Sequence, residues 1–275
     1  MVLLRAPFWP YRARGAATPW TPGLLAGGIA AALALSGWTV GRLGGWPGGL
    51  GLAVASAATH AGLLVVAWSI AVGNPPRWTA PSLRIAAVLF LASVASRVSA
   101  WGAVLYLGVP PLLLCEGRRA PGLDQIGLGL NAGLKAVVLG LAAGAFLGAH
   151  VLISAALTLG YGIRGPALGQ YLAAAAYDIG ANALTAELLF RGALFSRWWS
   201  RWEFWPAAAL STAVAVCRYI FDPALPAAIE VRVGTVFYMS LLGVTACALR
   251  AASGCLLPGY LAAVTFFLAY RLLTQ

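Results

Sequence analysis

The sequence predicts an all-α integral membrane protein, a helical bundle that crosses the bilayer several times. Of its 275 residues, 61% are hydrophobic and only 9% are charged, which is far outside the range of soluble domains. Long apolar runs alternate with short breaks rich in Gly and Pro. Because a membrane-spanning helix needs roughly 20 apolar residues, a chain of this length can hold about eight of them.

Three apolar runs in the first half of the chain predict helices. They cover residues 22–40, 49–72 and 83–107. Gly and Pro between them end each helix, since Pro lacks an N–H and Gly favours turns. Pro110 and Pro111 then begin a predicted loop that contains Glu116 and Asp124.

Five further runs predict the helices of the second half. They cover residues 128–159, 167–196, 204–221, 233–251 and 256–273. Pro223 and Pro226 fall in the loop after residue 221. Across both halves of the chain, most of the 11 tryptophans lie at the ends of the predicted helices, and four of them crowd the turn near residue 200. Indole rings favour the headgroup level of a bilayer, so we expect an aromatic belt.

The charge balance points to lipid headgroups as partners. The formal charge is +11, from 18 Lys and Arg against 7 Asp and Glu. The basic residues lie near helix ends, where anionic lipids bind them, so nucleic acid is not expected as a partner. Residues 1–20 mix Arg with aromatic rings and predict an interfacial segment that leads into a retained helix. The 4 cysteines contain no CxxC pair, and we expect neither a disulfide framework nor a metal site.

The segment Thr185–Gly192 places an acid and a base inside an apolar helix. Glu187 and Arg191 are four positions apart, so they share a helix face and can pair. Charged groups at membrane depth are expensive and mark either a site or a fixed internal contact.

This segment reads AELLFRG from Ala186 to Gly192 and resembles the first motif of the CPBP family. That family comprises the type II CAAX prenyl proteases and the bacteriocin-processing proteases, and its motif is E-E-x-x-x-R, usually followed by Gly. Residues 251–257 also resemble the turn before the family's last core helix. The resemblance implies a CPBP-like core over residues 128–275, preceded by residues 1–127 with the interfacial segment and about three membrane helices. It also implies a bacterial inner membrane location.

The sequence departs from the family at each catalytic position. Family members use the first glutamate as the base that activates water, and Ala186 stands there. Glu187 and Arg191 match the supporting pair. The histidine of the second motif falls on Tyr219, or on Arg218 with a one-residue shift. In the third motif, the histidine and asparagine positions fall on Ala263 and Phe267. The resemblance therefore implies a retained fold with no catalytic residues.

Other polar residues lie in the predicted helices around this motif. Asp178 and Asn182 precede Glu187 on the same helix and could line a polar cavity. Arg218 and Asp222 are four positions apart and are predicted to form a second ion pair. We interpret these groups as interhelical contacts, with a proton or ion path as the alternative.

The two histidines, His60 and His150, lie before the motif helix. Small residues surround His60, which leaves room for a flat macrocycle, and neutral imidazole is a good axial ligand. One hypothesis is therefore that His60 binds bacteriochlorophyll, chlorophyll or haem. The alternative, a hydrogen-bonded packing histidine, needs no cofactor. The same two interpretations apply to His150.

Three functions remain open from the sequence. The first is a non-catalytic subunit that has a structural or assembly role in a larger membrane complex with other protein subunits, with pigment association as one variant. The second is an active CPBP-type protease with altered catalytic residues, namely Glu187, Arg218 and Tyr219. The third is a proton or small-solute transporter that uses Asp178, Glu187 and Asp222.

Overall fold

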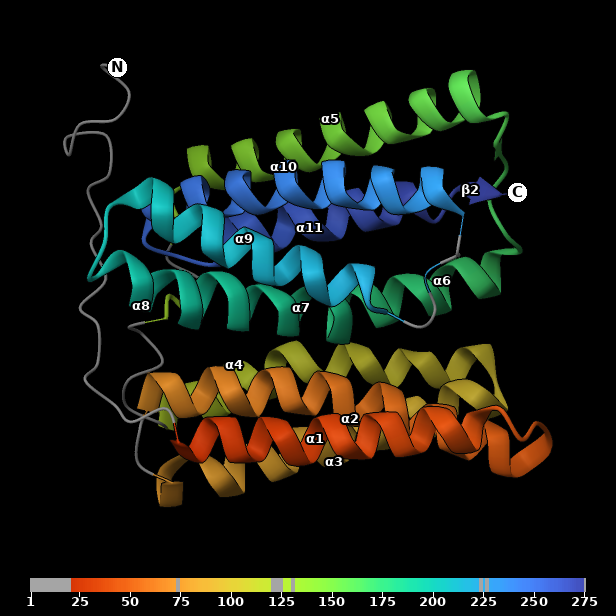
Figure 1. Cartoon of the computed structure of the whole chain (residues 1–275), viewed down its shortest axis with the longest axis horizontal. Coiled ribbons are helices and arrows are strands. Elements are labelled where there is room, and N and C mark those ends of the chain that lie inside the picture. Colours follow the sequence, from red (N-terminus) through yellow and green to blue (C-terminus); the bar gives the residue numbers. More distant parts are fainter. Residues whose placement is uncertain are drawn as a thin grey trace. The chain divides into compact units, whose positions relative to one another are not determined.

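The computed structural model describes residues 21–72, 75–119, 126–129, 132–222, 225 and 228–274. The predicted interfacial segment at residues 1–20, Asp124, Pro223 and Pro226 lie outside the described residues. Helices account for nearly all of the described chain (Figure 1). Six of them are long and apolar enough to cross a membrane. The protein is therefore an all-α membrane bundle, as the composition predicts.

The helices follow the predicted order, with differences at several ends. In chain order they are α1 (Thr21–Gly41), α2 (Gly45–Val72), α3 (Pro75–Val98), the 3₁₀ helix η3 (Ala100–Gly108), α4 (Val109–Arg119), α5 (Leu134–Leu159), α6 (Leu168–Tyr177), the π-helix η4 (Asp178–Asn182), α7 (Ala183–Ala186), the π-helix η5 (Glu187–Phe195), α8 (Ser196–Trp199), α9 (Phe204–Ile220), α10 (Ile229–Ser253) and α11 (Leu257–Tyr270).

The predicted helix 83–107 and the loop after it are wrong. The α-helix ends at Val98, because Ser99 is extended and its side chain accepts a hydrogen bond from the backbone N–H of Trp101, 3.2 Å away. The 3₁₀ helix η3 then runs directly into α4. Pro110 and Pro111 lie in the first turn of α4, where a missing N–H costs nothing. Glu116 is therefore on a helix and not in a loop.

The described residues form two compact units. One comprises residues 21–119 together with residues 167–189. Within it, α2 packs against α1, α3 and α7, while α6 packs against η3. Its core side chains are large and fully buried, and they include Leu64, Trp68, Ile85 and Leu89. Residues 167–189 thus pack with the N-terminal helices. The predicted boundary between residues 127 and 128 had placed them with the C-terminal helices.

The other unit comprises residues 126–166 and the chain from Phe190 onward. In it, α5 packs against α10 and α11, and α9 packs against α10. Two short strands, β1 (Gly162–Ile163) and β2 (Leu273–Thr274), form an antiparallel pair with Gly162 opposite Thr274. This pair joins the chain that follows α5 to the chain that follows α11.

Three glycines on one face of α5 allow it to approach α11 closely. Gly140, Gly144 and Gly148 are spaced by four residues and face α11. A Cβ at Gly144 would overlap the carbonyl oxygen of Ala262 and lie 2.9 Å from the Cβ of Thr265. Small residues at this spacing let helix backbones pack tightly in a membrane, where lipid removes the hydrophobic drive for association.

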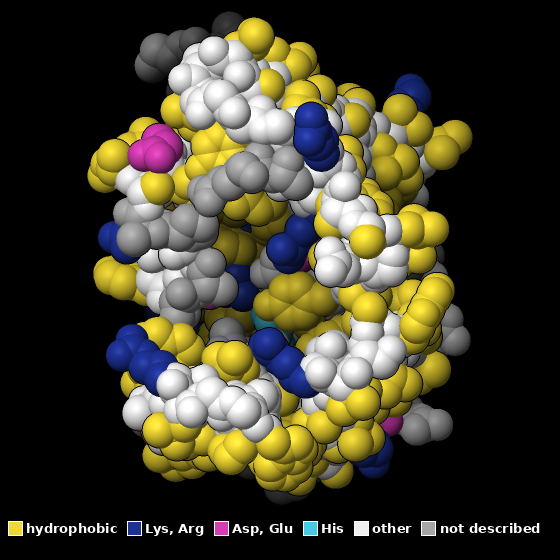
Figure 2. Space-filling view, turned by 90° about the vertical axis from the view of Figure 1, so that its right-hand side faces the viewer, with side chains coloured by type: hydrophobic (Ala, Val, Ile, Leu, Met, Phe, Trp, Pro, Cys, Tyr) yellow, Lys and Arg dark blue, Asp and Glu magenta, His cyan; other side chains and the backbone are white. Residues whose placement is uncertain are grey.

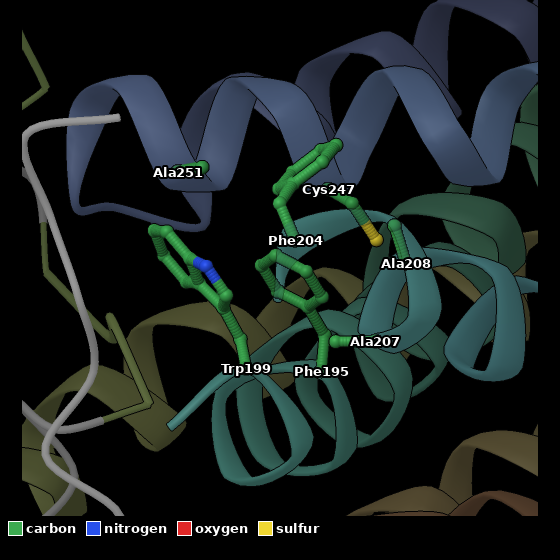
Figure 3. Close-up of a cluster of buried hydrophobic side chains, with 7 residues drawn as sticks. All are labelled: Phe195, Trp199, Phe204, Ala207, Ala208, Cys247 and Ala251. Atoms are coloured by element: carbon green, nitrogen blue, oxygen red, sulfur yellow. The ribbon is translucent and has the colours of Figure 1, made fainter. Parts of the chain in front are cut away.

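The turn near residue 200 contains a buried aromatic cluster (Figure 3). The Phe195 ring stacks on Trp199 with 5.2 Å between ring centroids, and it meets the edge of Phe204 at 5.7 Å. Cys247 and Ala251 of α10 complete the cluster. Trp199 is only 6% exposed, so for this residue the predicted belt position is wrong. Indole fills the core here because the small side chains of α9 and α10 leave space beside it.

Apolar side chains cover much of the surface. Figure 2 shows hydrophobic side chains spread over the viewed face and few acidic ones. The outward faces of α1 and α5 are the clearest cases, and their exposed residues include Leu25, Leu35, Leu139, Phe146 and Leu157. Such surfaces suit the hydrocarbon core of a bilayer.

Candidate functional site

One helical segment, Leu168–Trp199, carries the motif and the polar residues before it. The sequence predicts a helix over 167–196, and the structure confirms it. Two stretches of this segment are π-helical: η4 begins at Asp178 and η5 begins at Glu187. Single π turns occur frequently at functional sites, because the wider turn redirects side chains and frees backbone groups. No sequence signal predicted these two stretches.

The motif residues are deeply buried. Glu187 and Arg191 are each 3% exposed, and Ala186 is 2% exposed. Ala186, which the resemblance aligns with the family's catalytic base, has no group that could take a proton. The ion pair between Glu187 and Arg191 stays a prediction.

The π turn at the motif is stabilised by a neighbouring helix. The Ser211 hydroxyl of α9 donates to the Phe190 carbonyl at 2.6 Å. A π turn leaves a carbonyl outside the α-helical pattern, and a buried carbonyl needs a donor. No feature of the sequence predicted this role for Ser211.

Arg191 lies against α10 at a glycine. A Cβ built on Gly243 would lie 2.7 Å from Arg191 Nη2 and 2.8 Å from Thr212 Oγ1. The guanidinium group therefore has room only because residue 243 has no side chain. The neighbourhood of Arg191 is thus built by α9 and α10, far along the sequence from the motif.

His60 is the centre of a buried hydrogen-bonded cluster in the unit that contains α2. Its Nδ1 lies 3.0 Å from Thr185 Oγ1 and its Nε2 lies 2.8 Å from the Tyr177 hydroxyl. The ring is 1% exposed. Both ring nitrogens are engaged, so binding a metal macrocycle would require one of these hydrogen bonds to break. The geometry favours the packing interpretation of His60.

The tautomer of His60 follows from the Thr185 hydroxyl. That hydroxyl donates its one hydrogen to the Ala181 carbonyl at 2.8 Å. Thr185 Oγ1 can therefore only accept from His60, which places a hydrogen on Nδ1. With the ring neutral, Nε2 is bare and accepts from the Tyr177 hydroxyl.

Further polar contacts extend from this cluster. The Tyr177 ring meets the edge of Tyr106 with 5.5 Å between centroids, and the Tyr106 hydroxyl lies 2.7 Å from Ser93 Oγ. Asp178 Oδ1 accepts from Asn182 Nδ2 at 3.0 Å. Asp178 and Asn182 are thus in contact with each other on one helix, while the predicted polar cavity around them stays a prediction.

The positions assigned to the family's second and third motifs come together in the structure. The rings of Tyr219 on α9 and Phe267 on α11 are 5.9 Å apart between centroids. Ala263 is buried one turn before Phe267. Two rings therefore lie at positions that the resemblance aligns with the family's histidine and asparagine. The Arg218 guanidinium lies over the Tyr219 ring, 4.3 Å from its centroid.

Asp222 does not lie on the same helix as Arg218. Helix α9 ends at Ile220, and the Asp222 N–H donates to the Tyr219 carbonyl at 3.2 Å in the turn that follows. The helical spacing behind the predicted Arg218–Asp222 ion pair is therefore absent, because the chain leaves the helix before Asp222. The pair itself stays a prediction.

His150 has surroundings unlike those of His60. It is exposed on α5, and its Nδ1 lies 2.8 Å from the Tyr238 hydroxyl and 3.3 Å from Ser154 Oγ. Ser154 is one turn away on α5, and Tyr238 is on α10. The sequence treated both histidines alike, whereas the structure separates a buried one from an exposed one.

An ion pair that sequence reasoning missed joins α3 and α4. Arg84 Nε and Nη2 donate to the two carboxylate oxygens of Glu116, at 2.9 Å and 2.6 Å. The carboxylate side chain is only 3% exposed, whereas the Arg84 side chain is 54% exposed. The pair was missed because the two prolines predicted a loop around Glu116.

We expect the two halves of this pair to respond unequally to substitution. R84Q leaves the buried Glu116 carboxylate without its bidentate donor, whereas E116Q leaves an arginine that can reach water or headgroups. R84Q should therefore lower the melting temperature of the detergent-solubilised protein more than E116Q does. The melting temperature of the double variant should fall by less than the sum of the decreases in the two single variants. A larger loss for E116Q would contradict this account.

No cluster of three or more His, Cys, Asp or Glu side chains forms a metal site among the described residues. Compared with known proteins, the chain matches no family model, no curated protein and no solved structure. The resemblance to the CPBP family therefore rests on the motif around Glu187 and on the register that it sets.

Proposed function

We propose that this protein is a non-catalytic, CPBP-like membrane protein of a bacterial inner membrane that serves as a structural or assembly subunit of a larger complex. The observation that carries the proposal is the filling of the catalytic positions. Ala186, Tyr219, Ala263 and Phe267 stand where the family places its base and its histidine and asparagine groups.

The ring contact between Tyr219 and Phe267 supports this proposal. General-base catalysis needs a proton acceptor within hydrogen-bond reach of the water that it activates. A phenylalanine ring has no such group, and a neutral tyrosine is a poor base. Removing catalytic groups that act as a unit costs several orders of magnitude in rate. The two rings instead pack against each other where α9 and α11 meet, which is a structural contact.

The surface supports a role in an assembly. The apolar faces of α1 and α5 offer large areas to lipid or to other membrane helices. The exposed indoles Trp202 and Trp205 lie beside the buried aromatic cluster, and rings of this kind are enriched in protein interfaces. The positive charge adds anionic lipid headgroups to the expected partners.

Purification from native membranes tests this proposal. A tagged full-length chain, extracted in mild detergent, should migrate with the same membrane proteins at fixed stoichiometry through affinity and size-exclusion steps. Light scattering should give a protein mass well above the 28.4 kDa of one chain. A solitary monomer in several mild detergents would overturn the assembly role.

A peptidase assay tests the non-catalytic half of the proposal. Purified protein should not cleave prenylated or leader peptides, and E187Q should change nothing. E230Q is a matched control, because Glu230 is an exposed acid in the first turn of α10. Cleavage that E187Q abolishes and E230Q preserves would establish an active protease with altered catalytic residues.

A further inference from the structure

The exposed imidazole of His150 lies at membrane depth on the apolar helix α5. This helix is a candidate membrane span from Leu134 to Leu159. His150 is nine residues before its C-terminal end, about 14 Å along the helix axis at a rise of 1.5 Å per residue. An ionisable or polar ring exposed at this depth is costly in lipid and is a functional-site hypothesis by default.

The ring of His150 cannot turn freely toward the membrane surface. Its Nδ1 lies within hydrogen-bond distance of Tyr238, which is itself buried and packs against the Phe266 ring with 6.0 Å between centroids. Ser154 approaches the same nitrogen from α5. The ring therefore has a fixed orientation, and the contact spans α5, α10 and α11.

The second nitrogen, Nε2, has no hydrogen-bond partner in the part of the chain that the structure describes. A polar nitrogen that faces hydrocarbon lacks the hydrogen bonds that water would supply. When Nδ1 carries the hydrogen and donates it to the Tyr238 oxygen, Nε2 has a free lone pair. Metal-binding histidines commonly have this arrangement, in which the other ring nitrogen donates to a fixed acceptor.

The neighbours of His150 suit a flat apolar ligand. The Phe146 ring is 68% exposed, and its centroid lies 6.2 Å from that of the imidazole. Ala149 is exposed beside the histidine and is too small to block an approach. Ile153 and Leu157 continue the apolar face toward the end of the helix. A ligand at Nε2 would therefore contact an aromatic ring and aliphatic side chains.

We propose that His150 Nε2 is the axial ligand of a planar metal tetrapyrrole, a haem or a chlorophyll, bound on the lipid-facing surface of α5. The metal accepts the lone pair of Nε2, which satisfies the exposed nitrogen. The apolar rim of the macrocycle lies against Phe146 and against lipid. Tyr238 is a positioning residue, because it orients the imidazole. The site does not depend on the protein being non-catalytic.

Titration of the purified full-length protein in detergent with hemin and, separately, with bacteriochlorophyll a tests the site. The wild-type protein should shift the Soret band of hemin, or the long-wavelength band of bacteriochlorophyll, to the position of a histidine-ligated pigment. H150L should lose this spectrum. Y238F should weaken binding by about tenfold, as expected when a contact that orients a ligand is removed.

H150G separates loss of the ligand from loss of the fold. Added imidazole should enter the space left in H150G and restore the spectrum, while it should not do so in H150L. The source of the pigment follows from which titration responds, and from pigment extracted from protein purified from native membranes. Equal spectra for wild-type and H150L, or no histidine-type spectrum with either pigment, would overturn the proposal. A protein subunit that shields His150 in a purified pigment-free complex would also overturn it.

Discussion

Replacing Gly144 with leucine is expected to prevent the protein from accumulating in a folded form. The glycine face of α5 lies against the backbone of α11, and the nearest atoms to a new side chain would be the carbonyl oxygen and Cα of Ala262. Backbone atoms cannot move aside as the end of a flexible side chain can. We expect G144L to cost at least about 3 kcal/mol, the upper part of the range for overpacked cores.

Fluorescence-detected size exclusion and a thermal melt in detergent measure this effect. G234L is the matched control, because Gly234 lies on α10 in the same unit and a Cβ there would meet nothing within 4 Å. That variant should give a normal elution profile and an unchanged or slightly raised melting temperature, since glycine is a poor helix former. Equal behaviour of G144L and G234L would contradict the close packing of α5 on α11.

The variant H60F is expected to produce the second large loss of stability. Phenylalanine keeps most of the ring volume but removes the acceptor of the Tyr177 hydroxyl and the donor to Thr185. Each buried polar group that loses a hydrogen bond costs about 1–3 kcal/mol. The free energy of unfolding should therefore fall by about 2–4 kcal/mol.

A double-mutant cycle assigns this loss to the hydrogen bond between His60 and Tyr177. Y177F alone should be destabilising, and H60F with Y177F together should lose less than the sum of the two single changes, because the two groups interact directly. T39V is a surface control, since Thr39 is exposed on α1 and its side chain donates to the local Leu35 carbonyl. Strictly additive losses would argue against a direct His60–Tyr177 interaction.

Composition and the placement of Pro and Gly were sufficient to predict much of the architecture. The apolar runs predicted the membrane helices, and the two prolines at 75 and 76 mark the boundary between α2, which ends at Val72, and α3, which begins at Pro75. The loop predicted from the prolines at 110 and 111 was wrong, because a proline disrupts the interior of a helix but is tolerated in its first turn. The helix that contains the two prolines is preceded by another, because the extended backbone and capping hydroxyl of Ser99 start η3 at Ala100, nine residues before α4 begins at Val109.

The chemistry of the candidate site was less accessible from the sequence. The motif identified Glu187 and Arg191 as buried charges, because charged side chains within an apolar membrane helix face the protein interior and not the lipid. It did not indicate the π turns, the hydroxyl of Ser211 or the glycine at 243. These features depend on atoms from α9 and α10 that approach the motif only when the bundle is packed.

The two histidines show most clearly which properties the sequence determines and which depend on the tertiary structure. In the sequence, His60 and His150 each lie among small residues of an apolar helix, and the pattern favours the same two interpretations for both. Hydrophobic periodicity and helix breakers are local properties, so they can be read along the chain. Which nitrogen of an imidazole is occupied depends on residues about 90 to 125 positions away, Tyr238 for His150 and Thr185 for His60. Packing between helices therefore decides that His60 is enclosed and that His150 is exposed on the surface of α5.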